Sequence, residues 1–162
     1  MKIALIVLFL ITSFLIFKEA FYFLYLKTLI PHHIPHLDVR EFREFKQDTI
    51  LILDTRSLEE YQVSHIKGAQ WVGYDEFTLD KIDTFARDTT VVLYCSVGYR
   101  SDIVGKKLQE AGFQRVYNLW GGIFAWVNEE MPVYQEDKIT KKIHPYSSLW
   151  GFWLTKGEKV LP

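Results

Sequence analysis

Cysteine is the scarcest reactive residue of this chain, with one copy, Cys95, among 162 residues. A single cysteine excludes an intrachain disulfide and a zinc site built from several thiolates. It also leaves no second thiol in the chain that could resolve an oxidised Cys95. Disulfide bridges therefore give no indication of the redox compartment.

An excess of charge of one sign is also missing. Lys and Arg number 19 and Asp and Glu 20, so the net charge is −1 at pH 7. Without a basic field the chain is not expected to bind nucleic acid. The sequence shows no internal repeat and no low-complexity tract. With 49% hydrophobic and 16% aromatic residues, 162 residues suffice for one core, and we expect one domain that is a monomer.

Hydrophobic patterning predicts an α/β fold. Brief β-branched or leucine-rich runs at residues 49–53, 90–94 and 116–119 indicate buried strands. Helical patterns lie at residues 38–46, 57–62, 76–85 and 101–111. Asp38 and Glu41 form a capping-box pattern at the start of the first helix, and Gly112 suits a left-handed C-cap after the last. Alternating strands and helices predict a parallel sheet with helices on both faces.

The position of Cys95 favours a nucleophile. It follows the strand at 90–94 and opens a glycine-containing loop, residues 96–101, that leads into a helix. Backbone N–H groups and the helix dipole favour an anion at such a loop, and ligand sites of parallel sheets lie beyond the carboxyl ends of the strands. We therefore expect a lowered thiol pKa and a partly ionised Cys95. The alternative is a buried cysteine that only fills space.

Four segments in order resemble the single-domain rhodaneses, a sulfurtransferase family. The first is Leu53-Asp54-Thr55-Arg56 with Glu59-Glu60-Tyr61, and the second is His65-Ile66-Lys67-Gly68-Ala69. The third is the loop Cys95-x-x-Gly98-x-Arg100-Ser101, and the fourth runs from Gly112-Phe113 to Gly121-Gly122-Ile123 and Trp126. The resemblance covers residues 37–133 and implies a rhodanese-like domain there.

The resemblance implies sulfur transfer through Cys95. The thiolate would take sulfane sulfur from a small donor, hold it as a persulfide and pass it to a thiol or another nucleophile. No cofactor and no metal is expected. The expected substrate-binding residues are Ser96, Val97, Gly98, Tyr99, Arg100 and Ser101, whose backbone amides would hold the anionic sulfur while Arg100 supplies charge or locks the loop.

Four other motif residues are interpreted as framework near the site, namely Asp54, Arg56, Glu60 and His65. In the family, the residues matching Asp54 and Arg56 mostly orient loops, and an Arg56–Glu60 ion pair would tie the strand end to the following helix. His65 has the residue type of a general base. The resemblance instead places it in a structural turn.

Two other function classes remain. Rhodanese-related phosphatases carry one more residue between the cysteine and the arginine than the Cys95-x4-Arg100 loop does, so phosphatase activity is not expected. The stronger alternative is a noncatalytic binding module with the same fold at the membrane. The presence of Cys95 argues against it, because inactive family members commonly lack that residue.

The N-terminus is strongly apolar. Residues 3–17 are apolar apart from Thr12 and Ser13, and apolar residues resume at 20–26 after Lys18 and Glu19. We expect residues 1–30 to form a single-pass membrane anchor with the domain on the extracytoplasmic side. The alternative is a cleaved signal sequence that would release a secreted or periplasmic domain.

Two short regions complete the organisation. Residues 31–36 are expected to form a flexible, solvated linker, whose His32, His33 and His36 are not expected to bind metal. Residues 134–162 form an aromatic tail with Trp150 and Trp153 among its large side chains. We expect this tail to pack on the domain, and the alternative is a position at a membrane interface.

Overall fold

The computed structural model describes residues 2–45 and 49–161. Some sequence-based boundaries fall outside these residues, namely the helix end at Lys46 and the segment ends at Met1 and Pro162. The chain forms two compact units, residues 1–30 and 31–162. Each unit is described on its own.

The first unit consists of helix α1 (Lys2–Leu29). Lys18 lies in the interior of this helix and interrupts its apolar residues. Within the described residues, no helix combines the length and the apolarity needed to cross a membrane. The expected membrane-spanning anchor over residues 1–30 is therefore not supported by the structure.

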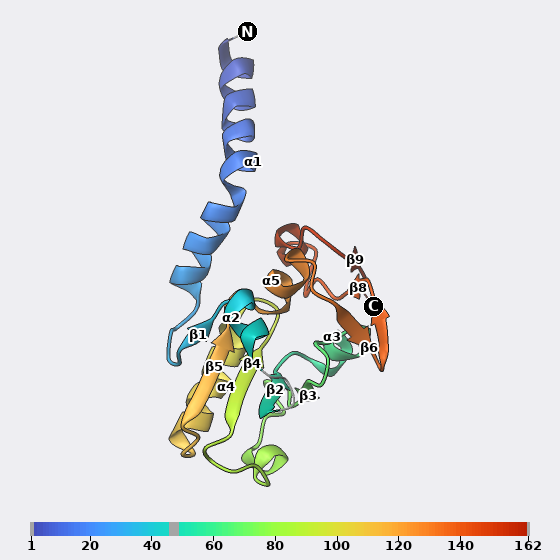
Figure 1. The fold of residues 1–162 in the computed structure, drawn as a ribbon. Coiled ribbons are helices and arrows are strands. Elements are labelled where there is room, and N and C mark those ends of the chain that lie inside the picture. The colour runs from blue at the N-terminus through green and yellow to red at the C-terminus, as the bar shows by residue number, and fades with distance from the viewer. Residues whose placement is uncertain (1, 46–48, 162) are drawn as a thin grey trace. The chain divides into compact units, whose positions relative to one another are not determined.

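A five-stranded parallel sheet forms the centre of the second unit (Figure 1). Its strands are β1 (His36–Leu37), β2 (Ile50–Asp54), β3 (Gln70–Trp71), β4 (Thr90–Tyr94) and β5 (Arg115–Leu119). Their order in the sheet is β1-β5-β4-β2-β3. The predicted parallel sheet is confirmed, including the three longest strands.

Local sequence signals determine where two of the helices begin. The helices are α2 (Val39–Glu44), α3 (Leu58–Val63), α4 (Tyr99–Glu110) and α5 (Gly122–Asn128). Asp38 and Glu41 form the predicted capping box of α2, and Ser57 and Glu60 form a second one for α3. Helix α4 begins two residues earlier than predicted, so Tyr99 and Arg100 belong to its first turn.

The helix predicted at residues 76–85 is wrong. Only the 3₁₀ turn η2 (Leu79–Ile82) forms there, after an extended Thr78. Phe77 and Ile82 are both buried in the core, five residues apart, which is not a helical repeat. Asp and Thr residues in this stretch also compete for backbone hydrogen bonds and lower helix propensity.

The core lies on both faces of the sheet. On one face, alternate residues of β2 and β4, such as Leu53 and Leu93, share a buried cluster with Val104 and Leu108 of α4. On the opposite face Phe42 of α2 packs against Trp126 of α5, with ring centroids 5.4 Å apart. Both strands are thus buried on two sides, as their continuous apolar sequences predicted.

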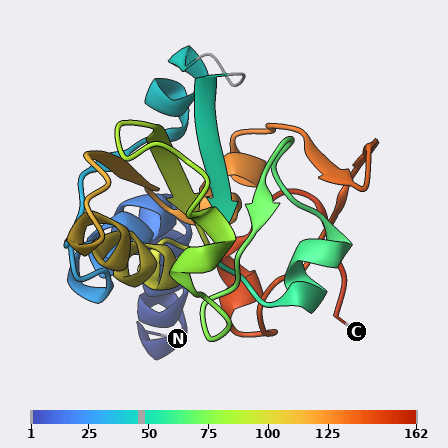
Figure 2. The ribbon, with the colours of Figure 1, turned by 90° about the horizontal axis from the view of Figure 1, so that it is seen from below.

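The chain after α5 folds into small strands beside α3 (Figures 1 and 2). The elements are β6 (Val133–Gln135), β7 (Lys138–Thr140), β8 (Lys142–Ile143), the turn η3 (Trp150–Trp153) and β9 (Glu158–Lys159). Strands β6 and β7 form a hairpin, and β8 pairs with β9. Asn128 of α5 hydrogen-bonds to Trp153, Thr155 and Lys156. The segment is therefore an ordered part of the second unit.

The expected flexible, solvated linker at residues 31–36 is also wrong. The His33 backbone N–H lies 3.1 Å and its Nδ1 2.8 Å from the carboxylate of Asp102, which is fully buried in α4. His36 Nε2 is 3.4 Å from the same carboxylate. A buried carboxylate needs such partners, so these histidines tie the segment to α4. Within the described chain, no group of three or more His, Cys, Asp or Glu residues could hold a metal ion.

Candidate active site

The carboxyl ends of three neighbouring strands meet at one edge of the sheet. Asp54 ends β2 and pairs in register with Tyr94, the last residue of β4. Asn118, near the end of β5, lies opposite Leu93. Cys95 follows Tyr94 directly, so its loop lies between the residues that end the two adjacent strands.

The loop after β4 folds around the sulfur of Cys95. The Gly98 backbone N–H donates to Cys95 Sγ over 3.1 Å. Gly98 has φ = 108°, a left-handed conformation that costs glycine little and turns the chain into α4. Cys95 itself is only 2% exposed. The loop therefore directs a backbone donor at a nearly enclosed thiol.

Opposing effects act on the pKa of Cys95, and the net shift is downward. Burial raises the pKa, while the positive charge of Arg100 and the backbone N–H groups of Ser101, Val97 and Gly98 lower it. These donors stabilise the thiolate more than burial disfavours it. The arrangement agrees with the thiolate expected from the sequence.

Arg100 is held by Glu60 and Ser96. Its Nη1 and Nη2 donate to the two carboxylate oxygens of Glu60 over 2.8 and 2.9 Å, and Nη2 also lies 3.0 Å from Ser96 Oγ. The Ser96 hydroxyl donates to Glu60 over 2.7 Å. Burial raises the pKa of Glu60, but Arg100, Arg56 and Ser96 outweigh it and hold the pKa at about 2. Glu60 is thus a carboxylate that fixes the arginine beside the thiol.

Asn118 supports the loop from the neighbouring strand. Its Nδ2 donates to the Gly98 carbonyl over 2.9 Å, and its Oδ1 accepts from the Ser101 hydroxyl over 2.8 Å. Both contacts are internal to the protein, because Asn118 and Ser101 are fully buried. The Ser101 hydroxyl therefore supports the loop and does not face a substrate.

The start of α5 supports the loop from the other side. Ile123 N–H donates to the Cys95 carbonyl over 2.9 Å, and Phe124 N–H donates to the Ser96 carbonyl over 3.1 Å. A Cβ added to Gly122 would lie in contact with the Cys95 carbonyl oxygen and only 2.7 Å from the Ser96 carbonyl carbon. Only glycine permits this close approach of the two backbones.

The expected ion pair between Arg56 and Glu60 is wrong. Arg56 is fully buried and donates to both oxygens of Asp54 at 2.6 to 3.1 Å and to the Ser64 carbonyl at 2.6 Å. Glu60 is instead engaged by Arg100. The Asp54–Arg56 pair closes the turn after β2, and this placement agrees with a framework role for both residues.

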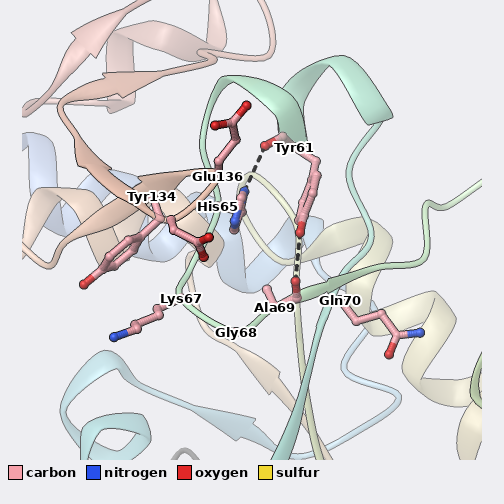
Figure 3. A pocket seen from close by; sticks show the side chains of 9 residues that line it. Tyr61, His65, Lys67, Gly68, Ala69, Gln70, Tyr134 and Glu136 are labelled. Atoms are coloured by element: carbon pink, nitrogen blue, oxygen red, sulfur yellow. Dashed lines mark hydrogen bonds between the residues drawn. The ribbon is translucent and has the colours of Figure 1, made fainter.

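His65 lines a surface hollow that does not include the Cys95 loop (Figure 3). Its ring stacks on Tyr61 at 4.2 Å, its Nδ1 lies 3.2 Å from the Tyr61 carbonyl, and its backbone pairs with Tyr134. Other residues that line this hollow include Lys67 and Glu136. These contacts are those of a structural turn.

The structure thus joins most of the expected site residues. Gly98, Val97 and Ser101 contribute backbone donors to Cys95, while Arg100 contributes charge. Val97 is buried, and Tyr99 is exposed at the start of α4. Sequence reasoning missed Asn118, whose only signal was a polar residue near the end of a buried strand. It also missed His144 and Tyr146, which approach Glu60 and Arg100 from the C-terminal segment.

The family model of the rhodanese-like domain matches residues 39–129, more than half of the chain. The chain belongs to the rhodanese-like family. This match includes α2 to α5 and all of the loop around Cys95. The rhodanese-like domain therefore contains Arg100 and all the backbone N–H groups that lower the pKa of Cys95.

Two curated relatives each match a little over half of this chain. A tRNA uridine(34) hydroxylase of Cytophaga hutchinsonii is 32% identical over 101 residues, which are 59% of this chain and 32% of that protein. The probable adenylyltransferase/sulfurtransferase MoeZ of Mycobacterium tuberculosis is 31% identical over 96 residues, 57% of this chain and 24% of that protein. The chain therefore spans about a third or less of either relative.

Among solved structures, a thiosulfate sulfurtransferase from Pseudomonas aeruginosa aligns with a TM-score of 0.55 and 26% identity. The alignment covers 63% of this chain and 20% of that one. It supports the rhodanese-like fold of the second unit, with its parallel central sheet.

Proposed function

We propose that this protein is a rhodanese-type sulfurtransferase that carries sulfane sulfur as a persulfide on Cys95. The observation that carries the proposal is the Gly98 N–H directed at Cys95 Sγ over 3.1 Å, with Arg100 beside it. A thiolate is the nucleophilic form of cysteine, and these groups favour it. Two similar proteins, a probable adenylyltransferase/sulfurtransferase and a thiosulfate sulfurtransferase, support the same class of reaction.

The first half-reaction forms the persulfide. The Cys95 thiolate attacks the outer sulfur of a donor R–S–S⁻, a new S–S bond forms, and the donor S–S bond breaks. The bonding pair leaves with RS⁻, or with sulfite when the donor is thiosulfate. Total charge is conserved, since one thiolate and one donor anion give one persulfide anion and one leaving anion.

The second half-reaction returns the enzyme to its starting state. An acceptor thiolate attacks the outer sulfur of the Cys95 persulfide, and the Cys95 thiolate leaves. The acceptor comes from a second molecule, because the chain has no other cysteine. The loop donors that stabilise the thiolate can also stabilise the persulfide anion, since the thiolate and the persulfide both place negative charge beside the same backbone N–H groups.

Mass spectrometry of the intact protein tests the proposal. After treatment with thiosulfate or a small persulfide and removal of excess reagent, we expect a mass increase of one sulfur atom on Cys95. Cyanide or a thiol should then remove it. The Cys95→Ser variant is the control.

Absence of the added sulfur with every donor would contradict the proposal. That result would favour the noncatalytic binding module instead. A sulfur adduct that persists in Cys95→Ser would show that another residue carries the modification.

A further inference from the structure

Residues beyond the family match contribute side chains to the region of Cys95. The match ends at residue 129, yet the ring of Tyr146 lies over the guanidinium of Arg100, with its centroid 5.1 Å from Cζ. Glu60 and Ser96 hold the polar edge of the same guanidinium. The side chain of Arg100 is left only 17% exposed. Arg100 is therefore fixed both at its edge and over one face.

The backbone at Tyr146 adopts a conformation that is unusual for this residue type. Its φ is 63°, in the left-handed region that bulky residues rarely occupy. The Tyr146 backbone N–H donates to Nδ1 of His144 over 3.1 Å. Such strain persists only where the surroundings stabilise it. Tyr146 has the hydrogen bond to His144, the contact with Arg100 and an edge-on contact with the Trp150 ring, whose centroid is 6.4 Å away.

His144 secures this turn from inside. It is buried, and burial lowers its pKa, although Glu60 and Glu59 raise it and Arg56 and Arg100 lower it further. A neutral imidazole has one nitrogen free to accept, which the Tyr146 N–H requires. The turn is thus built from a buried acceptor, a strained backbone and a ring placed over a buried ion pair.

We propose that Tyr146 is a positioning residue that holds the Arg100 guanidinium against the sulfur of Cys95 and covers one face of that guanidinium. The attraction between a guanidinium and an aromatic face is strongest where water is excluded. Without the ring, Arg100 gains water and freedom, and its charge stabilises the thiolate less. The uncovered guanidinium can then reach a dianionic donor such as thiosulfate.

The experiment uses the full chain with three substitutions. Tyr146→Gly removes the ring and suits the left-handed backbone, so the turn itself can persist. Tyr146→Phe keeps the aromatic face. Leu149→Ala is the matched control, because Leu149 is 81% exposed in the same segment. The first readout is the pH profile of Cys95 alkylation by iodoacetamide, and the second is the ratio of kcat/KM for thiosulfate to that for a small persulfide.

We expect Tyr146→Gly to shift the alkylation profile to higher pH and to raise the thiosulfate-to-persulfide ratio about three- to tenfold, the range of a single cation–π contact. Tyr146→Phe should restore the native profile, and Leu149→Ala should match the native protein. Coincident alkylation profiles of the native protein and Tyr146→Gly would overturn the proposal.

The ratio rests on the proposed sulfur transfer, whereas the alkylation profile does not. If no donor transfers sulfur to the native protein, the proposed function fails. The alkylation profile then still tests the position of Tyr146 on its own.

Discussion

At the scale of single residues, the pKa of Cys95 reports on the electrostatics of the loop. Because Arg100 and the backbone donors outweigh burial, its pKa is lowered. We expect the rate of alkylation by iodoacetamide to rise to its plateau with an apparent pKa below the ~8.5 of a free cysteine. The Cys95→Ser variant measures the background reaction of other groups. An apparent pKa at or above the free value would show that burial dominates.

Glu60 links stability to acid pH. Its pKa is about 2 in the folded protein against 4.5 ordinarily. The unfolded chain therefore binds the proton more readily, and the stabilisation is complete above pH 4.5 and is lost as pH falls through 2. The difference of about 2.5 units corresponds to about 3 kcal/mol.

Denaturant unfolding of the native protein and of Glu60→Gln at several pH values measures this stabilisation. We expect the variant to be about 3 kcal/mol less stable at pH 7, since it leaves Arg100 buried without its carboxylate. The difference should shrink as the pH falls from 4.5 toward 2. A difference that stays constant over that range would show that the charge of Glu60 does not stabilise the fold.

At the scale of elements, the contact between the start of α5 and the Cys95 loop depends on Gly122. Its φ is 57°, and a Cβ there would meet the backbone of Cys95 and Ser96. Gly68 has a similar φ of 73° but open space around it. Gly68→Ala should lower the free energy of unfolding by about 1 kcal/mol, from backbone strain alone.

Gly122→Ala should cost about 2 to 5 kcal/mol, because overpacking adds to the same strain. It should also displace the loop and slow Cys95 alkylation. Urea unfolding and alkylation rates of both variants measure the two effects. Equal losses of stability would mean that the loop can move away from α5 without cost.

Sequence patterns predicted those elements whose signals are local. The capping box at Asp38 and Glu41 places two polar groups three residues apart, so it needed no knowledge of the rest of the fold. The segment at 76–85 failed because Phe77 and Ile82 follow the shape of the core and not a helical repeat. The predicted ion-pair partner of Glu60 was wrong for the same reason. The true partner, Arg100, lies 40 residues away in sequence, and only the folded loop brings it close.

At the scale of the whole molecule, the sequence predicted that the C-terminal segment packs on the domain but not which residues it contacts. Its strands have two or three residues each, too short to give a periodic pattern. Its approach to the active site depends on contacts between residues far apart in sequence, such as Tyr146 with Arg100. The family resemblance could not supply them either, because it ends before this segment.

The extracytoplasmic location of the domain stays a prediction, based on the apolar run at residues 3–17. Alkaline phosphatase fused after Val160 should be active in cells, because its disulfides form only outside the cytoplasm. Intact-mass analysis of the same product shows whether the N-terminal segment is retained. An inactive fusion would place the domain in the cytoplasm.

The overall charge of the molecule predicts which donors it attracts. The net charge is −1, and Arg100, the one cation among residues 95–101, is already paired with Glu60. A dianion such as thiosulfate should therefore be steered weakly, and kcat/KM should be higher for a persulfide that carries less negative charge. Tyr99 is 40% exposed at the start of α4, so Tyr99→Lys should raise thiosulfate kcat/KM more than persulfide kcat/KM, most clearly at low salt. Leu79→Lys adds the same charge beside Lys107 and Glu110 in the last turn of α4, at the opposite end of that helix from Tyr99, and should change neither. Equal kcat/KM for thiosulfate and the persulfide would show that charge does not select the donor. A thiosulfate kcat/KM that is unchanged by Tyr99→Lys would show the same.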